Sequence, residues 1–124
     1  MRTYTDTANN LILTSERITA VPGMGGRSIA YERVKVTATD SVTATRIGNI
    51  GRVLDFKEVL GICSAKKVTS SAVSVLPSNA MPQFTHSKSS PSNVALQYFD
   101  FDTDDISLSS GEYYEFVVFG TVNT

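Results

Sequence analysis

Four aspartates stand close together near the end of the chain, in the run DFDTDD at 100–105, and they form its densest group of potential metal ligands. Their alternate spacing imitates the first positions of a calcium loop, which uses carboxylate oxygens. The match then ends, because the loop's sixth position needs Gly but is Asp105, and its twelfth needs Glu but is Gly111. We therefore predict a hairpin turn whose Asp side chains bond to the turn backbone, with no metal site and no cofactor.

The candidates for nucleophilic catalysis are few. His86 is the only histidine and Cys63 the only cysteine, so any catalytic triad or dyad must use His86. No GxSxG motif is present, and one Cys with one His cannot build a typical structural zinc site. Cys63 lies in the apolar run GICSA without a cationic neighbour to activate its thiol, which predicts a buried, inert side chain. We predict that His86 lies on the surface, that there are no catalytic residues, and that the protein is not an enzyme.

The elements that must position these residues are short β-strands. Ser and Thr together number 29, and runs of β-branched and aromatic residues recur about every ten residues with turn signals between them. This pattern is typical of an all-β fold, so we predict an antiparallel β-sandwich, jelly-roll-like, of about seven short strands and little helix. One domain spans 1–124, with a loose N-terminal segment at about 1–8. The strands are predicted at 10–14, 28–39, 43–47, 58–65, 67–77, 94–101 and 111–122.

Several stretches depart from simple alternation. In SIAYERVKVTAT at 28–39 the apolar residues change face between Tyr31 and Val34, which predicts a bulge or bend there. The mixed spacing in RVLDFKEVLGICSA predicts a short helical turn at 53–57 leading into a strand. AVPGMGG at 20–26 is predicted as a loop, and 78–93 as mostly loop with short pairing at QFTH.

Charge and composition exclude several classes of partner. The net charge is −1, but residues 1–67 carry +4 and residues 68–124 carry −5. The basic residues are scattered singly, which argues against nucleic acid, and no apolar run is long enough to span a membrane. A single cysteine fits a reducing compartment, and no secretory signal is visible. The uneven distribution of charge along the chain either serves contacts between copies, or the fold brings the positive and negative residues together in space.

The strand GEYYEFVVFGTV at 111–122 is apolar on both faces. A strand with one face on a core and one in water alternates apolar and polar residues, so something must cover the second face. One explanation is a sister subunit in a homo-oligomer, and the other is a loop of the same chain such as 78–93. One face holds Tyr114, Phe116 and Val118, and the other, our candidate subunit interface, holds Tyr113, Val117 and Phe119.

The order of pieces in 53–122 resembles that of capsid decoration (cement) proteins of tailed bacteriophages. The likeness is carried by VLDFKEVLGICSA at 53–65, the hairpin QYFDFDTDDISL at 97–108, and the closing VVFGTV at 117–122. The resemblance implies a non-enzymatic structural protein of the virion, made in the host cytoplasm, that lies on the capsid surface. Its implied partners are the major capsid protein, across whose neighbouring subunits it would bridge, and copies of itself. A trimer is favoured over a dimer.

Three other functions stay open. A tail or head-fibre component would be expected to continue into repeats or a trimeric stalk, which this chain does not show. A carbohydrate-binding β-sandwich module needs an exposed aromatic platform. A small hydrolase needs a polar cleft around His86.

Overall fold

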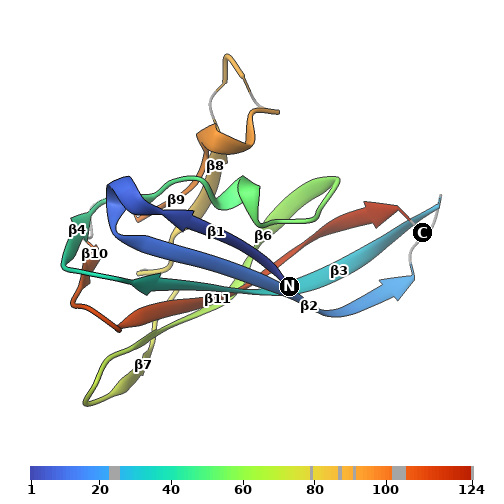
Figure 1. Cartoon of the computed structure of the whole chain (residues 1–124). Coiled ribbons are helices and arrows are strands. Elements are labelled where there is room, and N and C mark those ends of the chain that lie inside the picture. Colours follow the sequence, from blue (N-terminus) through green and yellow to red (C-terminus); the bar gives the residue numbers. More distant parts are fainter. Residues whose placement is uncertain (23–25, 79, 87, 91, 102–105, 124) are drawn as a thin grey trace.

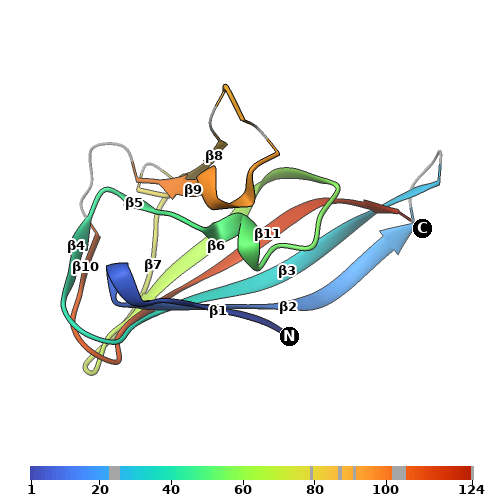
Figure 2. The same cartoon turned by 45° about the horizontal axis from the view of Figure 1, so that its top comes forward.

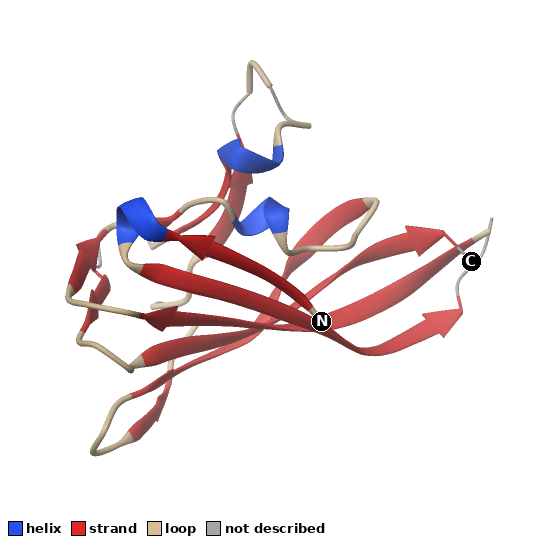
Figure 3. Ribbon diagram, viewed as in Figure 1, coloured by secondary structure: helices blue, strands red, loops and turns tan. Residues whose placement is uncertain are grey.

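The computed structural model describes residues 1–22, 26–78, 80–86, 88–90, 92–101 and 106–123. Within them the regular structure is eleven strands and three short 3-10 turns, with no α-helix (Figure 3). The strands are β1 (Arg2–Asp6), β2 (Leu11–Pro22), β3 (Arg27–Ala38), β4 (Val42–Ala44), β5 (Arg46–Ile47), β6 (Glu58–Val68), β7 (Val73–Val75), β8 (Gln83–His86), β9 (Gln97–Asp100), β10 (Ile106–Leu108) and β11 (Tyr113–Asn123). The turns are η1 (Thr7–Asn9), η2 (Ile50–Arg52) and η3 (Val94–Leu96).

The strands form two layers, which confirms the predicted all-β antiparallel sandwich. One layer is a six-stranded sheet in the order β1-β2-β3-β11-β6-β7. The other consists of the three-stranded sheet β5-β9-β8 and the pair β10-β4, with η2 beside them (Figures 1 and 2). All paired strands run antiparallel. The far ends of β2, β3 and β11 extend beyond the second layer (Figure 2).

The core lies between the layers and is centred on aromatic rings. Phe116 of β11 meets Phe99 of β9 edge to face, with ring centroids 4.7 Å apart, and both are fully buried. Phe101 and Tyr114 complete the cluster at 6.1 Å and 5.8 Å from Phe116. Such pairs contribute beyond the area they bury, so this cluster joins the layers. The predicted inward face of 111–122 is therefore confirmed, since Tyr114, Phe116 and Val118 are all buried.

The N-terminal segment is not loose, which corrects our expectation for residues 1–8. β1 pairs along its whole length with β2, from Arg2 opposite Ser15 to Asp6 opposite Leu11. Tyr4 packs against the core, and Arg2 donates to the carbonyl of Leu54 at 3.0 Å. The polar composition of this segment suits an edge strand, whose outer face and free edge meet water.

The predicted bulge between Tyr31 and Val34 is also wrong. β3 alternates regularly, with buried residues at every second position from Ser28 to Ala38. The irregularity lies in the neighbouring strand, between Arg17 and Thr19 of β2. The sequence misled because Glu32 occupies a core-facing position while Tyr31 lies on the outer face, so the apolar residues change face although the strand stays regular.

One predicted helical turn and one predicted strand are shifted. The turn expected at 53–57 lies earlier, at η2, where Asn49 adopts a left-handed conformation (φ 62°) and Val53 enters the core fully buried. The strand expected at 94–101 begins with η3, because the side chain of Asn93 accepts a hydrogen bond from the Ala95 amide and caps a 3-10 turn. The QFTH pairing is confirmed as β8. The loop predicted at 20–26 starts too early, because β2 continues to Pro22. Residues 23–25 of this loop and 102–105 of DFDTDD lie outside the described residues.

Candidate binding face

The side of the six-stranded sheet that faces away from the core carries the candidate site. We call it the ring face and define it by eight residues at its centre. They belong to the neighbouring strands β3, β11 and β6, and their side chains are half-buried or exposed. They are Tyr31, Arg33, Lys35, Lys66, Tyr113, Glu115, Val117 and Phe119.

Strict alternation positions these side chains. Because successive residues of a strand point to opposite faces, burying Tyr114, Phe116 and Val118 turns their neighbours outward. β3 and β11 pair without a register shift from Tyr113 opposite Thr37 to Asn123 opposite Arg27. In the part of the chain that the structure describes, the second layer lies on the core side only (Figure 2).

Two aromatic rings stand side by side across the central strands. Phe119 and Tyr31 are directly opposite each other, with ring centroids 6.0 Å apart and an angle of 27° between their planes. Gly61 faces Phe119 on β6, and a Cβ built there would be 3.3 Å from the Phe119 ring. The missing side chain lets this ring lie against the β6 backbone. The two rings are therefore stacked near-parallel to each other on rigid strands.

Charged groups flank the rings. Lys35 lies over the ring of Tyr113, with Nζ 4.1 Å from its centroid. Glu115 is 3.4 Å from Arg33 and 3.5 Å from Lys66. Arg33 also contacts Glu16 of β2 at 3.0 Å. Ion pairs this exposed contribute little to stability, so their main effect is to hold donors and acceptors beside the rings.

The three residues predicted as a subunit interface, Tyr113, Val117 and Phe119, all lie on the ring face and are half-buried. The alternative cover, the segment 78–93, is wrong, because β8 within it pairs with β9 in the opposite layer. The sequence did not indicate the partners on β3. The available signal was that Ile29 and Tyr31 share one face of the strand, but the change of face after Tyr31 led to the prediction of a bulge instead of an apolar outer surface.

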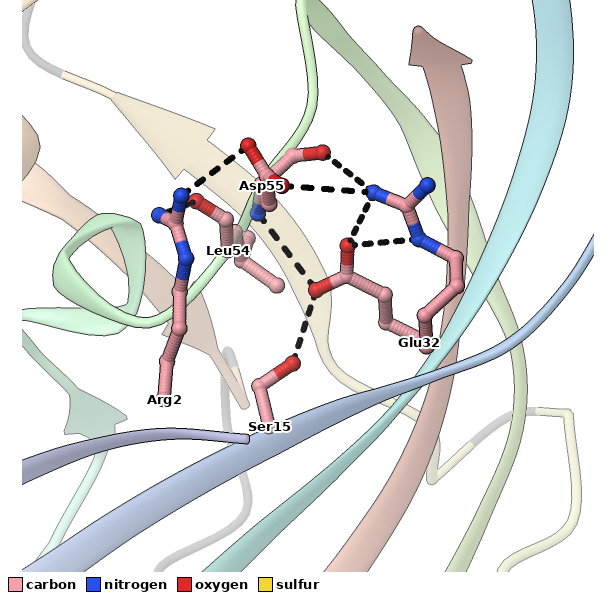
Figure 4. A network of polar contacts seen from close by, with 6 residues as sticks. Arg2, Ser15, Glu32, Leu54 and Asp55 are labelled. Carbon is pink, nitrogen blue, oxygen red and sulfur yellow. Dashed lines mark hydrogen bonds and ion pairs between the residues drawn. The ribbon is translucent and has the colours of Figure 1, made fainter.

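A buried polar network supports one end of the sheet (Figure 4). Glu32, 2% exposed, accepts hydrogen bonds from Ser15 Oγ (2.7 Å), the Asp55 amide (3.4 Å), and both Nε and Nη2 of Arg17 (3.2 and 2.9 Å). Arg17 also donates to the Asp55 carbonyl, and the Asp55 carboxylate pairs with Arg2. A buried carboxylate is tolerated only when its oxygens are bonded in this way. The network therefore fastens the 54–55 segment to β1, β2 and β3.

His86 and Cys63 lie on different parts of the molecule. His86 lines a hollow of about 650 Å³ together with Phe56, Lys57, Glu58 and Phe84, among others, and Cys63 is not among its lining residues. Cys63 is exposed, which corrects the expected buried thiol. The cause is a register shift: Val117 faces Ser64 while Val118 faces Ile62, so Cys63 is the extra residue of a bulge.

Neither a metal centre nor a membrane helix emerges from the described residues. They contain no group of three or more His, Cys, Asp or Glu side chains placed to hold a metal ion. No helix among them is long and apolar enough to cross a membrane.

Comparison with known proteins adds a likeness of fold. No protein-family model and no curated protein matches this chain. A solved structure does match: a CBM3a-L domain, a type of carbohydrate-binding module, with its flanking linkers, from the scaffoldin cipA of the Clostridium thermocellum cellulosome. The match covers 98% of this chain and 76% of that chain, with 18% identity and a TM-score of 0.52. At this identity the likeness establishes a shared β-sandwich fold, and function must come from the site.

Proposed function

We propose that this protein is a non-enzymatic β-sandwich module that binds a polysaccharide through the ring face. The observation that carries the proposal is the near-parallel pair Tyr31 and Phe119 on an uncovered sheet. Aromatic rings offer large, rigid apolar surfaces, on which the apolar faces of sugar rings stack. The strands hold both rings before binding, so little side-chain entropy is lost on association.

The flanking charges suit the same ligand. Sugar hydroxyls both donate and accept hydrogen bonds, and the guanidinium of Arg33, the ammonium of Lys66 and the carboxylate of Glu115 supply donors and acceptors around the rings. Their mutual ion pairs keep them in place without burying them. A few fixed polar groups beside an apolar surface are the usual arrangement for orienting a bound ligand.

The likeness to a carbohydrate-binding module agrees with this proposal, although it concerns the fold alone. We therefore rank polysaccharide binding above the capsid function, and the aromatic pair on the ring face supports this order.

The test is depletion of the protein from solution by insoluble polysaccharides: microcrystalline cellulose, chitin and xylan. We expect saturable binding to at least one of them, and at least a tenfold weaker affinity for the double variant Tyr31→Ala/Phe119→Ala. Tyr98→Ala is the matched control, because it removes a half-buried ring, packed under Arg46, from the opposite layer. No binding to any of the three, or equal binding by the double variant, would contradict the proposal.

A second candidate is the capsid decoration protein expected from the sequence. The composition of the ring face favours it, because Tyr, Phe and Arg are enriched at protein interfaces. In that case Tyr113, Val117 and Phe119 contact sister subunits in a trimer on the major capsid protein. Phe119→Glu would place an unpaired charge in the contact and dissociate the trimer. Sedimentation velocity measures this, and absence of a trimer for the unmodified protein would remove this candidate.

A further inference from the structure

The edge strand β7 is short, with three residues, but it carries no charge, proline or bulge that would hinder pairing. Its three residues, Val73, Ser74 and Val75, are all exposed, the two valines at 64% and 76%. Among the described strands, β6 alone pairs with it, so its other edge is free. Natural sheets protect such edges by keeping the edge strand very short, as β7 is, or with Lys, Pro or a bulge. Here the residues from Ala72 to Leu76 are uncharged and contain no Pro, and Val73, Ser74 and Val75 pair with β6 in unbroken register.

The hydrogen-bond pattern shows which backbone groups the free edge offers. The Leu76 amide donates to the Ala65 carbonyl at 2.9 Å, so residues 65 and 76 form a hydrogen-bonded pair. In an antiparallel ladder such pairs alternate with pairs that exchange no hydrogen bonds. Ser74 therefore bonds to Lys67, while the N–H and C=O groups of Val73 and Val75 point away from β6.

We propose that two copies of this chain pair through β7, antiparallel about a two-fold axis at Ser74. In this register Val73 of each copy lies opposite Val75 of the other, and both positions carry outward N–H and C=O groups. The pairing forms four backbone hydrogen bonds and leaves none of these outward groups unpaired. A shift by one residue would place an outward group opposite an inward one and lose the bonds.

The sequence Val-Ser-Val favours a second copy over an unrelated strand. A two-fold axis makes the contact self-complementary, and it brings four valines together on one face in cross-strand pairs. Val73 and Val75 share the face of Tyr113, because Val73 is opposite Val68 and Val68 is opposite Tyr113. The two ring faces thus lie on the same side of one continuous twelve-stranded sheet.

The consequence for binding rests on the proposed function. Two ring faces on one side of a rigid sheet can contact the same polysaccharide surface together. Bivalent contact raises the apparent affinity without any new contact in the individual site. The dimer itself does not depend on sugar binding, so the two proposals can fail separately.

The first test is sedimentation equilibrium over a range from 1 µM to 1 mM. We expect a concentration-dependent dimer that the double variant Val73→Lys/Val75→Lys weakens at least tenfold, because four like charges would then face each other. The matched control is Ile18→Lys/Val21→Lys, which adds the same charges at exposed positions of β2. We expect the control to dimerise like the unmodified protein.

The second test is cross-linking at the axis. The two Ser74 Cα atoms are expected to lie about 4.5 Å apart, as in a non-hydrogen-bonded pair, and a disulfide bridges that distance. In a Cys63→Ser background, which removes the one native thiol, Ser74→Cys should form a disulfide-linked dimer on mild oxidation. Ser71→Cys in the same background is the control, because residues 71 would lie three positions from the axis in each copy.

Three results would overturn the dimer. One is a monomer throughout the concentration range, and another is cross-linking of Ser74→Cys no faster than of Ser71→Cys. The third is an oligomer that Phe119→Glu dissociates but Val73→Lys/Val75→Lys does not. That result would assign the contact to the ring face. If the unmodified protein dimerises but binds none of the polysaccharides, the proposed function is contradicted and the dimer is not.

Discussion

Replacing Glu32 by Ala tests whether the buried network holds the sheet together. Glu32 is 2% exposed, and Ser15, whose hydroxyl donates to it, is 3% exposed. Deleting the carboxylate leaves this hydroxyl without its acceptor, which costs about 1–3 kcal/mol for a buried polar group. It also removes Oε2, which accepts the hydrogen bonds from both Nε and Nη2 of Arg17.

The loss at Arg17 is smaller than for a fully buried pair. Breaking a buried salt bridge by removing one partner costs about 3–5 kcal/mol. The side chain of Arg17 is 36% exposed, however, and it keeps its 2.8 Å bond to the Asp55 carbonyl. Water and the Asp55 carbonyl therefore compensate most of the Arg17 charge that Glu32 leaves unpaired. We expect Glu32→Ala to lower the free energy of unfolding by about 3 kcal/mol in total, mostly from the unpaired Ser15 hydroxyl and from lost packing. This is a large part of the roughly 5–15 kcal/mol that stabilises a typical domain.

Urea denaturation monitored by circular dichroism measures the effect. With a slope of about 2 kcal/mol per molar urea, the midpoint should fall by about 1.5 M at unchanged slope. Glu32→Gln is the matched variant, because its amide oxygen can still accept from Ser15 and the Asp55 amide. We expect it to lose about 1–2 kcal/mol. A loss below about 1 kcal/mol for Glu32→Ala would refute the argument, since it would mean that water reaches the carboxylate.

Four further outcomes follow from the packing. Phe116→Ala should reduce the free energy of unfolding by about 3–5 kcal/mol in the same urea assay, because it empties the centre of the core. Gly120→Ala should cost about 1–3 kcal/mol, since its Cβ would collide with the Glu58 carbonyl. Gly48→Ala, which meets nothing within 4 Å, should change the midpoint little or raise it. Phe119→Glu should keep the β-type circular dichroism spectrum, because this ring lies outside the core.

The local pattern of the sequence was sufficient for the fold class. Period-two alternation and frequent turn signals are properties of neighbouring residues, so they predicted an antiparallel β-sandwich without knowledge of the pairing. The same alternation placed Tyr113, Val117 and Phe119 on one face and Tyr114, Phe116 and Val118 on the other, as the structure has them. Half of the ring face was therefore visible in a single strand.

The partners of that strand were decided only by the tertiary structure. Phe119 meets Tyr31 across 88 positions of sequence, and their contact depends on the register of β3 against β11. A shift of one residue would turn every side chain to the other face, and no short segment encodes which register wins. Glu32 appeared to break the pattern of its strand because its partners, Ser15, Arg17 and Asp55, come from elsewhere in the chain. The exposure of Cys63 likewise follows from a bulge, which arises between two paired strands and is a property of neither one alone.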